Sequence, residues 1–372
     1  MKMERSRVAQ ICAVFTALAS AGSFGLASGG CSQSDDGGAD HHDDGPHASD
    51  ASHQHTHGKP VCFNGQQLDL GEEEATILVN HGGSRGQCER VENRTSLGQG
   101  YLQSVYQLND DGSPKMIGIT LDEKGLQTLP TNEVNDGATC WDNNNDGVIN
   151  RMTECSGGHE RVLWFPDIKD LPIKWMMFNW QGHGHAPEGV FSVPHFDLHY
   201  FIMDYVERNY MRTGPCDQFI PCPEWAKAAK DIGLEFWPPG YLNAKGIQGR
   251  MGNHMINKNS PEWQGKGLAQ AFAYGLYDGH MSFWEPVVSV DWLKGKPVEC
   301  KPVIQQPAVE IRGWYAKTYC TRHRPDRHDY LMSLEDFAFR ETPSGYDAGT
   351  PPPPPPPGDA GPTDSGMHDH DM

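Results

Sequence analysis

Alternation of apolar and polar residues predicts a domain built mainly of β-strands between residues 60 and 342. Short runs of β-branched and aromatic residues recur there, and each run is bounded by turn residues, which is typical of strands. The predicted strands are 101–108, 116–121, 162–165, 173–180, 196–203, 272–276, 281–290 and 330–339. Two turn signals, Asn109–Gly112 and Tyr277–His280, predict that the strands flanking each of them pair as antiparallel hairpins.

Helical signals are fewer in this region. Asp204–Arg212 is followed by Gly214, and Pro223–Ile232 has proline at its start and Gly233 after its end. Proline at the first turn and glycine after the last are typical of helix boundaries. The pattern therefore predicts an α+β fold that is predominantly antiparallel β, barrel- or sandwich-like, with a few short helices.

Both ends of the chain lack this pattern. Residues 31–59 are rich in Asp, Gly, Ser and His, and residues 343–372 contain seven consecutive prolines, Pro351–Pro357, followed by an Asp- and His-rich end. Such segments bury too little apolar surface to offset the entropy of ordering, so we predict a disordered tether and a disordered tail. Their histidines could bind metals loosely, although a solvated linker is the favoured interpretation. These histidines are His41, His42, His47, His53, His55, His57, His368 and His370.

Residues 1–30 have the features of an export signal. Lys2, Arg5 and Arg7 precede a mostly apolar run from Val8 to Ala21, and small residues follow. The run is short for a membrane-spanning helix, so a cleaved signal peptide is favoured over a retained anchor.

The segment ending at Cys31 resembles the lipobox of bacterial lipoproteins, in which the cysteine is lipidated and becomes the new N-terminus. Ser28 departs from that pattern, because the family prefers an aliphatic residue three positions before the cysteine. Secretion with one unpaired cysteine is the alternative, and it is less favoured because odd free thiols are unusual outside the cell. We therefore predict a cell-envelope lipoprotein, or a secreted protein, with a membrane anchor at Cys31.

Eight cysteines remain if Cys12 leaves with the signal and Cys31 carries lipid. They fall along the chain as four neighbouring couples, and none of the couples has the CxxC spacing of zinc ribbons or thioredoxins. Many pairings are compatible with the sequence. The simplest is Cys62–Cys88, Cys140–Cys155, Cys216–Cys222 and Cys300–Cys320.

The composition is strongly acidic, with 49 Asp and Glu against 30 Lys and Arg and a formal net charge of −19. Such a surface repels phosphate backbones, so nucleic acid is excluded as a partner. Metal ions and cationic ligands are more compatible with this charge.

The segment 195–200 carries the strongest candidate chemistry. Polar and apolar residues alternate strictly, so a strand would place His195, Asp197 and His199 on one face. Alternate residues of a strand lie about 6.6 Å apart, which suits two ligands of one ion, whereas His195 and His199 would be roughly 13 Å apart. We therefore expect His195 with Asp197, or Asp197 with His199, as the close couple.

Further ligands would have to come from elsewhere in the chain. His185 lies in a Gly-rich loop, His254 follows Gly252-Asn253, His280 lies in a predicted turn, and Glu285 lies in the next strand. Imidazole and carboxylate together suit zinc, iron, manganese or copper. The alternative is structural, because buried His and Asp often satisfy each other by hydrogen bonds.

Residues 142–150 resemble the start of a calcium-binding loop, with Asp142, Asn144, Asp146 and Val148 at ligand positions and Gly147 at the turn. Thr153 stands where an EF-hand requires glutamate, and no flanking helix is evident. The alternative is an Asx-rich turn that needs no ion.

Several segments together resemble an uncharacterised family of secreted bacterial domains, classed as a domain of unknown function. Its motifs GHxPxG, PHFDxHFY, GxH, YGxYDG and EPM correspond to 184–189, 194–201, 252–254, 274–279 and 285–287, and the resemblance covers roughly residues 92 to 340. Tyr200-Phe201 inverts the aromatic order, and Val287 replaces methionine. The resemblance implies a single β-rich α+β domain and homo-oligomerisation. It also directs attention to His185, His195, Asp197, His199, His254 and Glu285.

The sequence thus indicates an extracytoplasmic metal-binding domain, and a non-catalytic envelope module is the favoured interpretation. The alternative is a metal-dependent enzyme, a hydrolase or an oxygenase, whose ion is held by the same His, Asp and Glu residues. A purely structural role of these residues is the third hypothesis.

Overall fold

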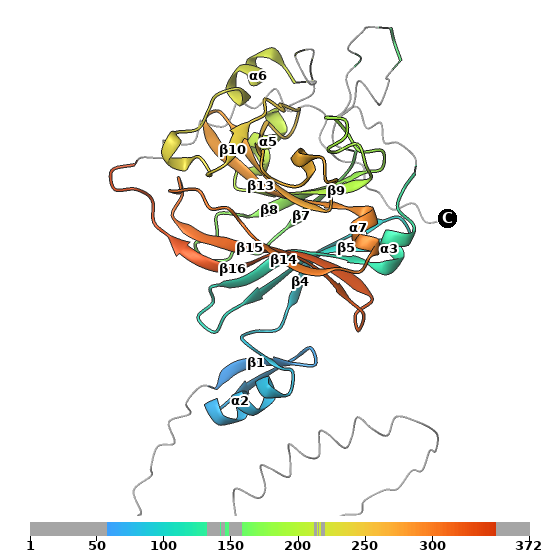
Figure 1. Cartoon of the computed structure of the whole chain (residues 1–372). Coiled ribbons are helices and arrows are strands. Elements are labelled where there is room, and N and C mark those ends of the chain that lie inside the picture. Colours follow the sequence, from blue (N-terminus) through green and yellow to red (C-terminus); the bar gives the residue numbers. More distant parts are fainter. Residues whose placement is uncertain are drawn as a thin grey trace, which may run out of the picture. The chain divides into compact units, whose positions relative to one another are not determined.

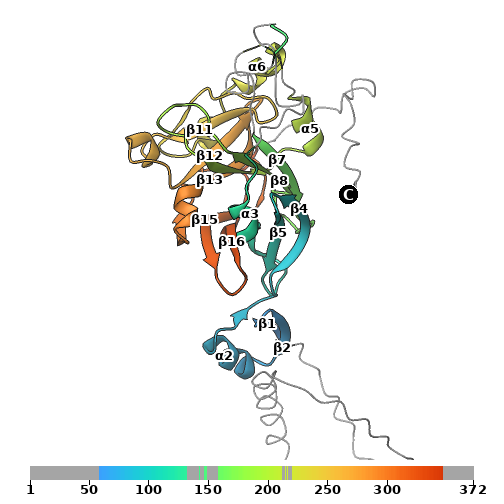
Figure 2. The ribbon, with the colours of Figure 1, turned by 90° about the vertical axis from the view of Figure 1, so that its right-hand side faces the viewer.

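The computed structural model describes residues 58–131, 142, 146–148, 158–211, 214, 216 and 220–346. Within them, two large antiparallel sheets stack face to face, and a small third sheet lies near the start (Figures 1 and 2). None of the sheets closes on itself, so the described fold is a sandwich-like α+β fold rather than a barrel. The predicted fold class is confirmed.

The first large sheet has seven strands and carries the candidate site. Its spatial order is β10 (Tyr241–Asn243), β11 (Asn253–Asn257), β12 (Gln270–Tyr277), β13 (His280–Ser289), β9 (His195–Phe201), β8 (Trp175–Gln181) and β7 (His159–Trp164). β8 and β9 are buried along their whole length. They lie inside the sheet and are covered on both faces, so the polar residues of β9 are buried as fully as its apolar ones.

The second large sheet closes the core from the other side. Its order is β14 (Val298–Pro302), β15 (Gly313–Arg324), β16 (Asp329–Arg340), β6 (Pro114–Asp122), β5 (Gly100–Leu108) and β4 (Arg90–Leu97). Apolar side chains from both sheets form one continuous core. The Tyr200 hydroxyl donates to the Met332 carbonyl at 3.2 Å and so links β9 to β16 across this core.

The remaining elements are short. The small sheet consists of β1 (Lys59–Phe63), β2 (Gln66–Leu70) and β3 (Ser84–Arg85), and the helices are α2 (Glu72–Asn80), α3 (Glu123–Gln127), α5 (Tyr205–Tyr210), α6 (Cys222–Ala228) and α7 (Val290–Lys294). Two 3-10 turns span Leu234–Phe236 and Glu262–Gln264. α5 and α6 lie on the side of the seven-stranded sheet that faces away from the core (Figure 1). None of the helices in these described ranges is long and apolar enough to cross a membrane.

Each predicted strand corresponds to one of the strands above, and both predicted hairpins form, β5 with β6 and β12 with β13. The sequence pattern did not reveal the other described strands, which are β1, β2, β3, β4, β10, β11, β14 and β15. β4 is polar and largely exposed at a sheet edge, so it lacks the alternation that marks a half-buried strand. At the C-terminal boundary, Tyr346 lies four residues beyond position 342 and packs edge-on to Phe236.

Three of the four predicted disulfides are present, Cys62–Cys88, Cys216–Cys222 and Cys300–Cys320. Cys140 and Cys155 lie outside the described residues.

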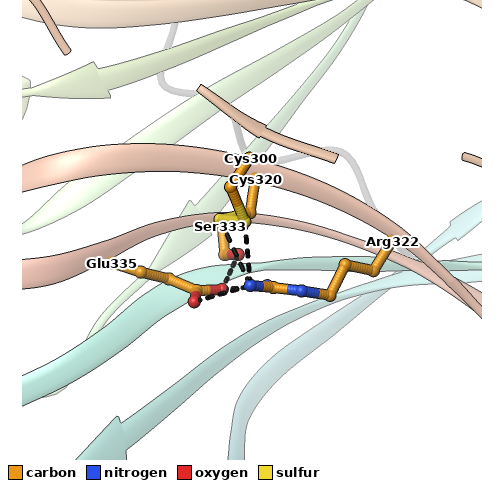
Figure 3. Close-up of a disulfide and its surroundings, with 5 residues drawn as sticks. All are labelled: Cys300, Cys320, Arg322, Ser333 and Glu335. Atoms are coloured by element: carbon orange, nitrogen blue, oxygen red, sulfur yellow. Dashed lines mark hydrogen bonds and ion pairs between the residues drawn. A yellow bond between two sulfur atoms is a disulfide. The ribbon is translucent and has the colours of Figure 1, made fainter. Parts of the chain in front are cut away.

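Cys300 and Cys320 face each other directly across β14 and β15. Arg322 donates to their sulfurs at 3.0 and 3.3 Å and also pairs with Glu335 on β16 (Figure 3). This disulfide therefore fixes the edge strand of the sheet.

Candidate metal centre

Strand β9 carries apolar side chains on one face and polar side chains on the other. Phe196, Leu198 and Tyr200 belong to the core between the sheets. The alternate residues His195, Asp197 and His199 lie on the opposite face, yet their exposed fractions are only 0%, 2% and 0%. Loops and helices above the sheet cover that face, so the predicted alternation yields a row of buried polar groups.

The first ligand group contains His185, His195 and Asp197. His195 Nε2 lies 3.2 Å from one carboxylate oxygen of Asp197, and His185 Nε2 lies 3.7 Å from the other. Gln181, at the end of β8 and opposite His195, donates a hydrogen bond of 3.2 Å to Asp197. Of the two expected couples, His195 with Asp197 is therefore the one that forms.

The second ligand group contains His199, His254 and Glu285. Because Trp284 pairs with Tyr200 in the register of β13 and β9, Glu285 lies opposite His199. His199 Nε2 is 3.3 Å from one oxygen of Glu285, and His254 Nε2, from β11, is 3.6 Å from the other. Three strands that are far apart in sequence thus supply this group.

Backbone carbonyls fix the orientation of three of the four histidines. Nδ1 of His185, His195 and His254 lies 2.6, 2.6 and 2.7 Å from the carbonyl oxygens of Ala186, Val193 and Gly246. A carbonyl only accepts, so each Nδ1 carries the hydrogen. Nε2 of each ring faces a carboxylate and is the nitrogen left to ligate a metal ion, which is the usual arrangement of a metal-ligating histidine.

Five buried polar atoms of the two groups make no well-formed hydrogen bond, although two of them, His195 Nε2 and Asp197 Oδ1, lie 3.2 Å apart. The five atoms are His195 Nε2, Asp197 Oδ1, His199 Nδ1 and Nε2, and Glu285 Oε2. Buried polar atoms normally have partners, and leaving one unpaired costs about 1–3 kcal/mol. Such atoms clustered in one place, all of them metal-ligating types, fit a cation that binds among them.

Burial and charge act in opposite directions on the two carboxyls. Burial alone would raise the pKa of Asp197, but the adjacent His195 and His185 rings hold it well below its usual range. Burial, with the nearby charge of Asp197, raises the pKa of Glu285 well above its usual range. Burial also lowers the pKa of His199 to about 3, so this ring is neutral near pH 7 and free to ligate.

A cavity of about 90 Å³ lies beside the ligand atoms. It is lined by His185, Ala186, Pro187, Phe191, Asp197, His199, Ala244, Gly246, Gln248, Met251, His254, Ile256, Trp263, Ala273, Glu285 and Val287. These lining residues, all within the described chain, include no lysine or arginine. The space holds a few water-sized groups in addition to the ligands.

Two glycines shape this cavity. A Cβ at Gly184 would lie 2.3 Å from the Phe191 carbonyl oxygen, so only glycine permits the tight loop that places His185. A Cβ at Gly275 would lie 2.2 Å from the ring of Phe283. That ring packs edge-on against His199 at a centroid distance of 4.9 Å and also contacts His254, so it supports the second group.

Other candidates from the sequence lie elsewhere. His280 bonds to Glu310 and is not part of either group. In the predicted calcium loop, Asn144 lies outside the described residues, and Asp142 accepts hydrogen bonds from the backbone of Asp146 and Gly147. These bonds are those of an Asx-rich turn, and calcium binding stays a prediction. Cys31 and the histidines of both tails lie outside the described residues.

Sequence reasoning missed Gln181 and the aromatic cavity wall of Phe191 and Trp263. Gln181 ends a predicted strand, but a lone glutamine carries no metal signal. Its role follows only from the pairing of β8 with β9.

No family model, no curated protein and no solved structure matches this chain. The resemblance to a family of secreted bacterial domains therefore stays a prediction, and the geometry of the site carries the functional argument.

Proposed function

We propose that this protein is an extracytoplasmic metal-binding domain whose buried cavity holds divalent transition metal through His185, His195, Asp197, His199, His254 and Glu285. The proposal is carried by the ligand atoms without well-formed hydrogen bonds that face one another in a partly open, mostly apolar cavity. A ligand set that combines imidazole nitrogens with carboxylate oxygens favours zinc, iron, manganese or copper over calcium or magnesium, which prefer oxygen ligands alone.

Elemental analysis tests this proposal most directly. The tail histidines would bind metal on their own, so the full chain is used with His41, His42, His47, His53, His55, His57, His368 and His370 replaced by asparagine; we call this the tail-substituted protein. We expect it to retain metal after dialysis, and we expect Asp197→Asn combined with Glu285→Gln to lose it. His328→Asn, at an exposed histidine, is the matched control and should retain it. A tail-substituted protein that binds no metal would refute the proposal.

An exported location is part of the same proposal. Three disulfides stabilise the described chain, and disulfides persist in oxidising compartments outside the cytoplasm. We propose that Cys31 is lipidated and tethers the domain to the membrane. Labelling cells with a fatty-acid analogue should mark the wild type and leave Cys31→Ser unmarked, whereas equal labelling of both would disprove the anchor.

The cavity supports a second candidate, a metal-dependent enzyme. Three protein ligands in a group leave coordination positions open, and the cavity offers room beside them. A metal ion there would supply Lewis acidity or an activated water. Gln181 would hold Asp197 in place, and the Val193 carbonyl would keep the Nε2 lone pair of His195 toward the cavity.

The two candidates differ in whether outside ligands reach the ion. Cobalt in the tail-substituted protein should change its visible spectrum on addition of azide if a position is open. An unchanged spectrum in a fully loaded protein would favour the non-catalytic module.

A further inference from the structure

The six proposed ligands fall into two sets of identical composition. Each set has two histidines and one carboxylate, namely His185, His195 and Asp197 in the first and His199, His254 and Glu285 in the second. Within each set the ligand atoms lie within 4.8 Å of one another. In the described residues, no set of three mixes members of the two, so the ligands converge on two points rather than one.

Metal–ligand bond lengths show that one ion cannot bind both sets. Zinc binds imidazole nitrogen and carboxylate oxygen at about 2.0–2.2 Å, so donors to one ion lie at most roughly 4.4 Å apart. One ion at the second set is therefore out of reach of the first. We infer that the cavity holds two metal ions, each in its own set of two histidines and one carboxylate; this inference rests on the proposed function and adds the number of ions and their ligands.

The two sets are neighbours within one cavity. Asp197 lies opposite Val287, two residues from Glu285, so the carboxylates are diagonal neighbours on adjacent strands. Such neighbours lie about 7–8 Å apart. Members of both sets, including His185, His199 and His254, line the same space, so both ions would share it.

Charge also suits a pair of divalent ions. Their four positive charges would meet two carboxylates and four neutral histidines, and the lining contains no lysine or arginine to repel them. The high negative charge of the whole chain further favours cation entry.

The sets differ in rigidity, which predicts an order of filling. All three ligands of the second set lie on strands, and the exposed fractions of the His199 and Glu285 side chains are 1% and 6%. The first set depends on His185, which lies in a loop and is 32% exposed. Ligands on rigid elements are better preorganised, so the second set should fill first.

The experiment counts ions in the tail-substituted protein after equilibrium dialysis against Zn²⁺. We expect about two ions per chain in the parent, filled in two steps, and about one in each of two variants. The variants are His185→Ala with His195→Ala and His199→Ala with His254→Ala. The control, His280→Ala with His328→Ala, removes two histidines outside the sets and should keep both ions.

Each result decides between the claims. One ion in the parent would overturn the two-ion inference and leave the proposed function standing, whereas no ion would overturn both. If an alanine pair fails to fold, the near-isosteric Asp197→Asn and Glu285→Gln are used singly, and each should remove one ion. Loss of both ions, or of neither, in these single variants would contradict independent sets.

Discussion

The two faces of strand β9 are equally buried and chemically opposite. Phe196, Leu198 and Tyr200 face a core in which apolar side chains interlock. His195, Asp197 and His199, one position away in each case, lie on the opposite face, where Asp197 and His199 line a cavity and several ligand atoms lack well-formed hydrogen bonds. The comparison teaches that burial serves stability on one face and ligand binding on the other, at a cost that bound metal would offset.

Truncation on the apolar face should have the largest effect. Phe196 is fully buried and packs against Phe178 and Trp180 at centroid distances of 5.0 and 5.2 Å. We expect Phe196→Ala to lower the free energy of unfolding by about 3–5 kcal/mol, because it removes apolar burial and leaves a cavity. Urea unfolding of the metal-free protein measures this. A loss below about 1 kcal/mol would mean that this face is not the main core.

Metal should stabilise the protein through the polar face. At a free metal concentration one hundred times the dissociation constant, each ion that binds to the folded state alone adds about 2.7 kcal/mol. Thermal unfolding of the tail-substituted protein with zinc and with a chelator tests this. Phe196→Ala should gain a similar amount if it still folds, since its defect lies on the other face. Equal stability with zinc and with chelator would mean that the polar face of β9 does not bind metal.

A third prediction disturbs the polar face without changing any polar residue. In Gly275→Ala the new methyl group would collide with Phe283 and push it toward His199 and His254. We expect a loss of about 1–3 kcal/mol in unfolding free energy and weaker zinc binding at the second set. Gly182→Ala is the control, because its Cβ would lie 3.5 Å from the Trp180 ring, an ordinary contact. Calorimetric zinc titration should separate the two variants.

The smallest effect concerns pH and the metal-free protein. The pKa of Glu285 is raised by burial and by Asp197, so the folded state keeps this proton after the unfolded state has lost it. The stability contributed by this group is complete below about pH 4.5 and falls as the pH rises above it. Glu285→Gln should remove this decline and be more stable near pH 7, by the order of 1 kcal/mol. Urea midpoints of both proteins, measured from pH 4 to 7, test this. If the two midpoints changed with pH by the same amount, the prediction would be wrong.

The predicted strands could be found because each of them carries its own local pattern of apolar residues and turn signals. The alternation at 195–200 identified both faces of β9 before any partner was known. Glu285 and His254 were named from their segments, but the sequence offered no reason to place them beside His199 rather than Asp197. Polar strands such as β4, and Gln181 with its hydrogen bond to Asp197, were missed because their roles depend on neighbouring strands and not on local pattern.

The sequence by itself determined the strand-rich class, the acidic character, the neighbouring cysteine couples and the row of ligands on β9. Only the tertiary structure decided that the candidate ligands divide into two sets and that members of both line one cavity. The physical reason is the distance in sequence over which each effect acts. Side-chain alternation and turn chemistry act over a few residues. The register that brings β11, β13 and β9 into one sheet joins segments many tens of residues apart, and it is set by packing of the whole sandwich.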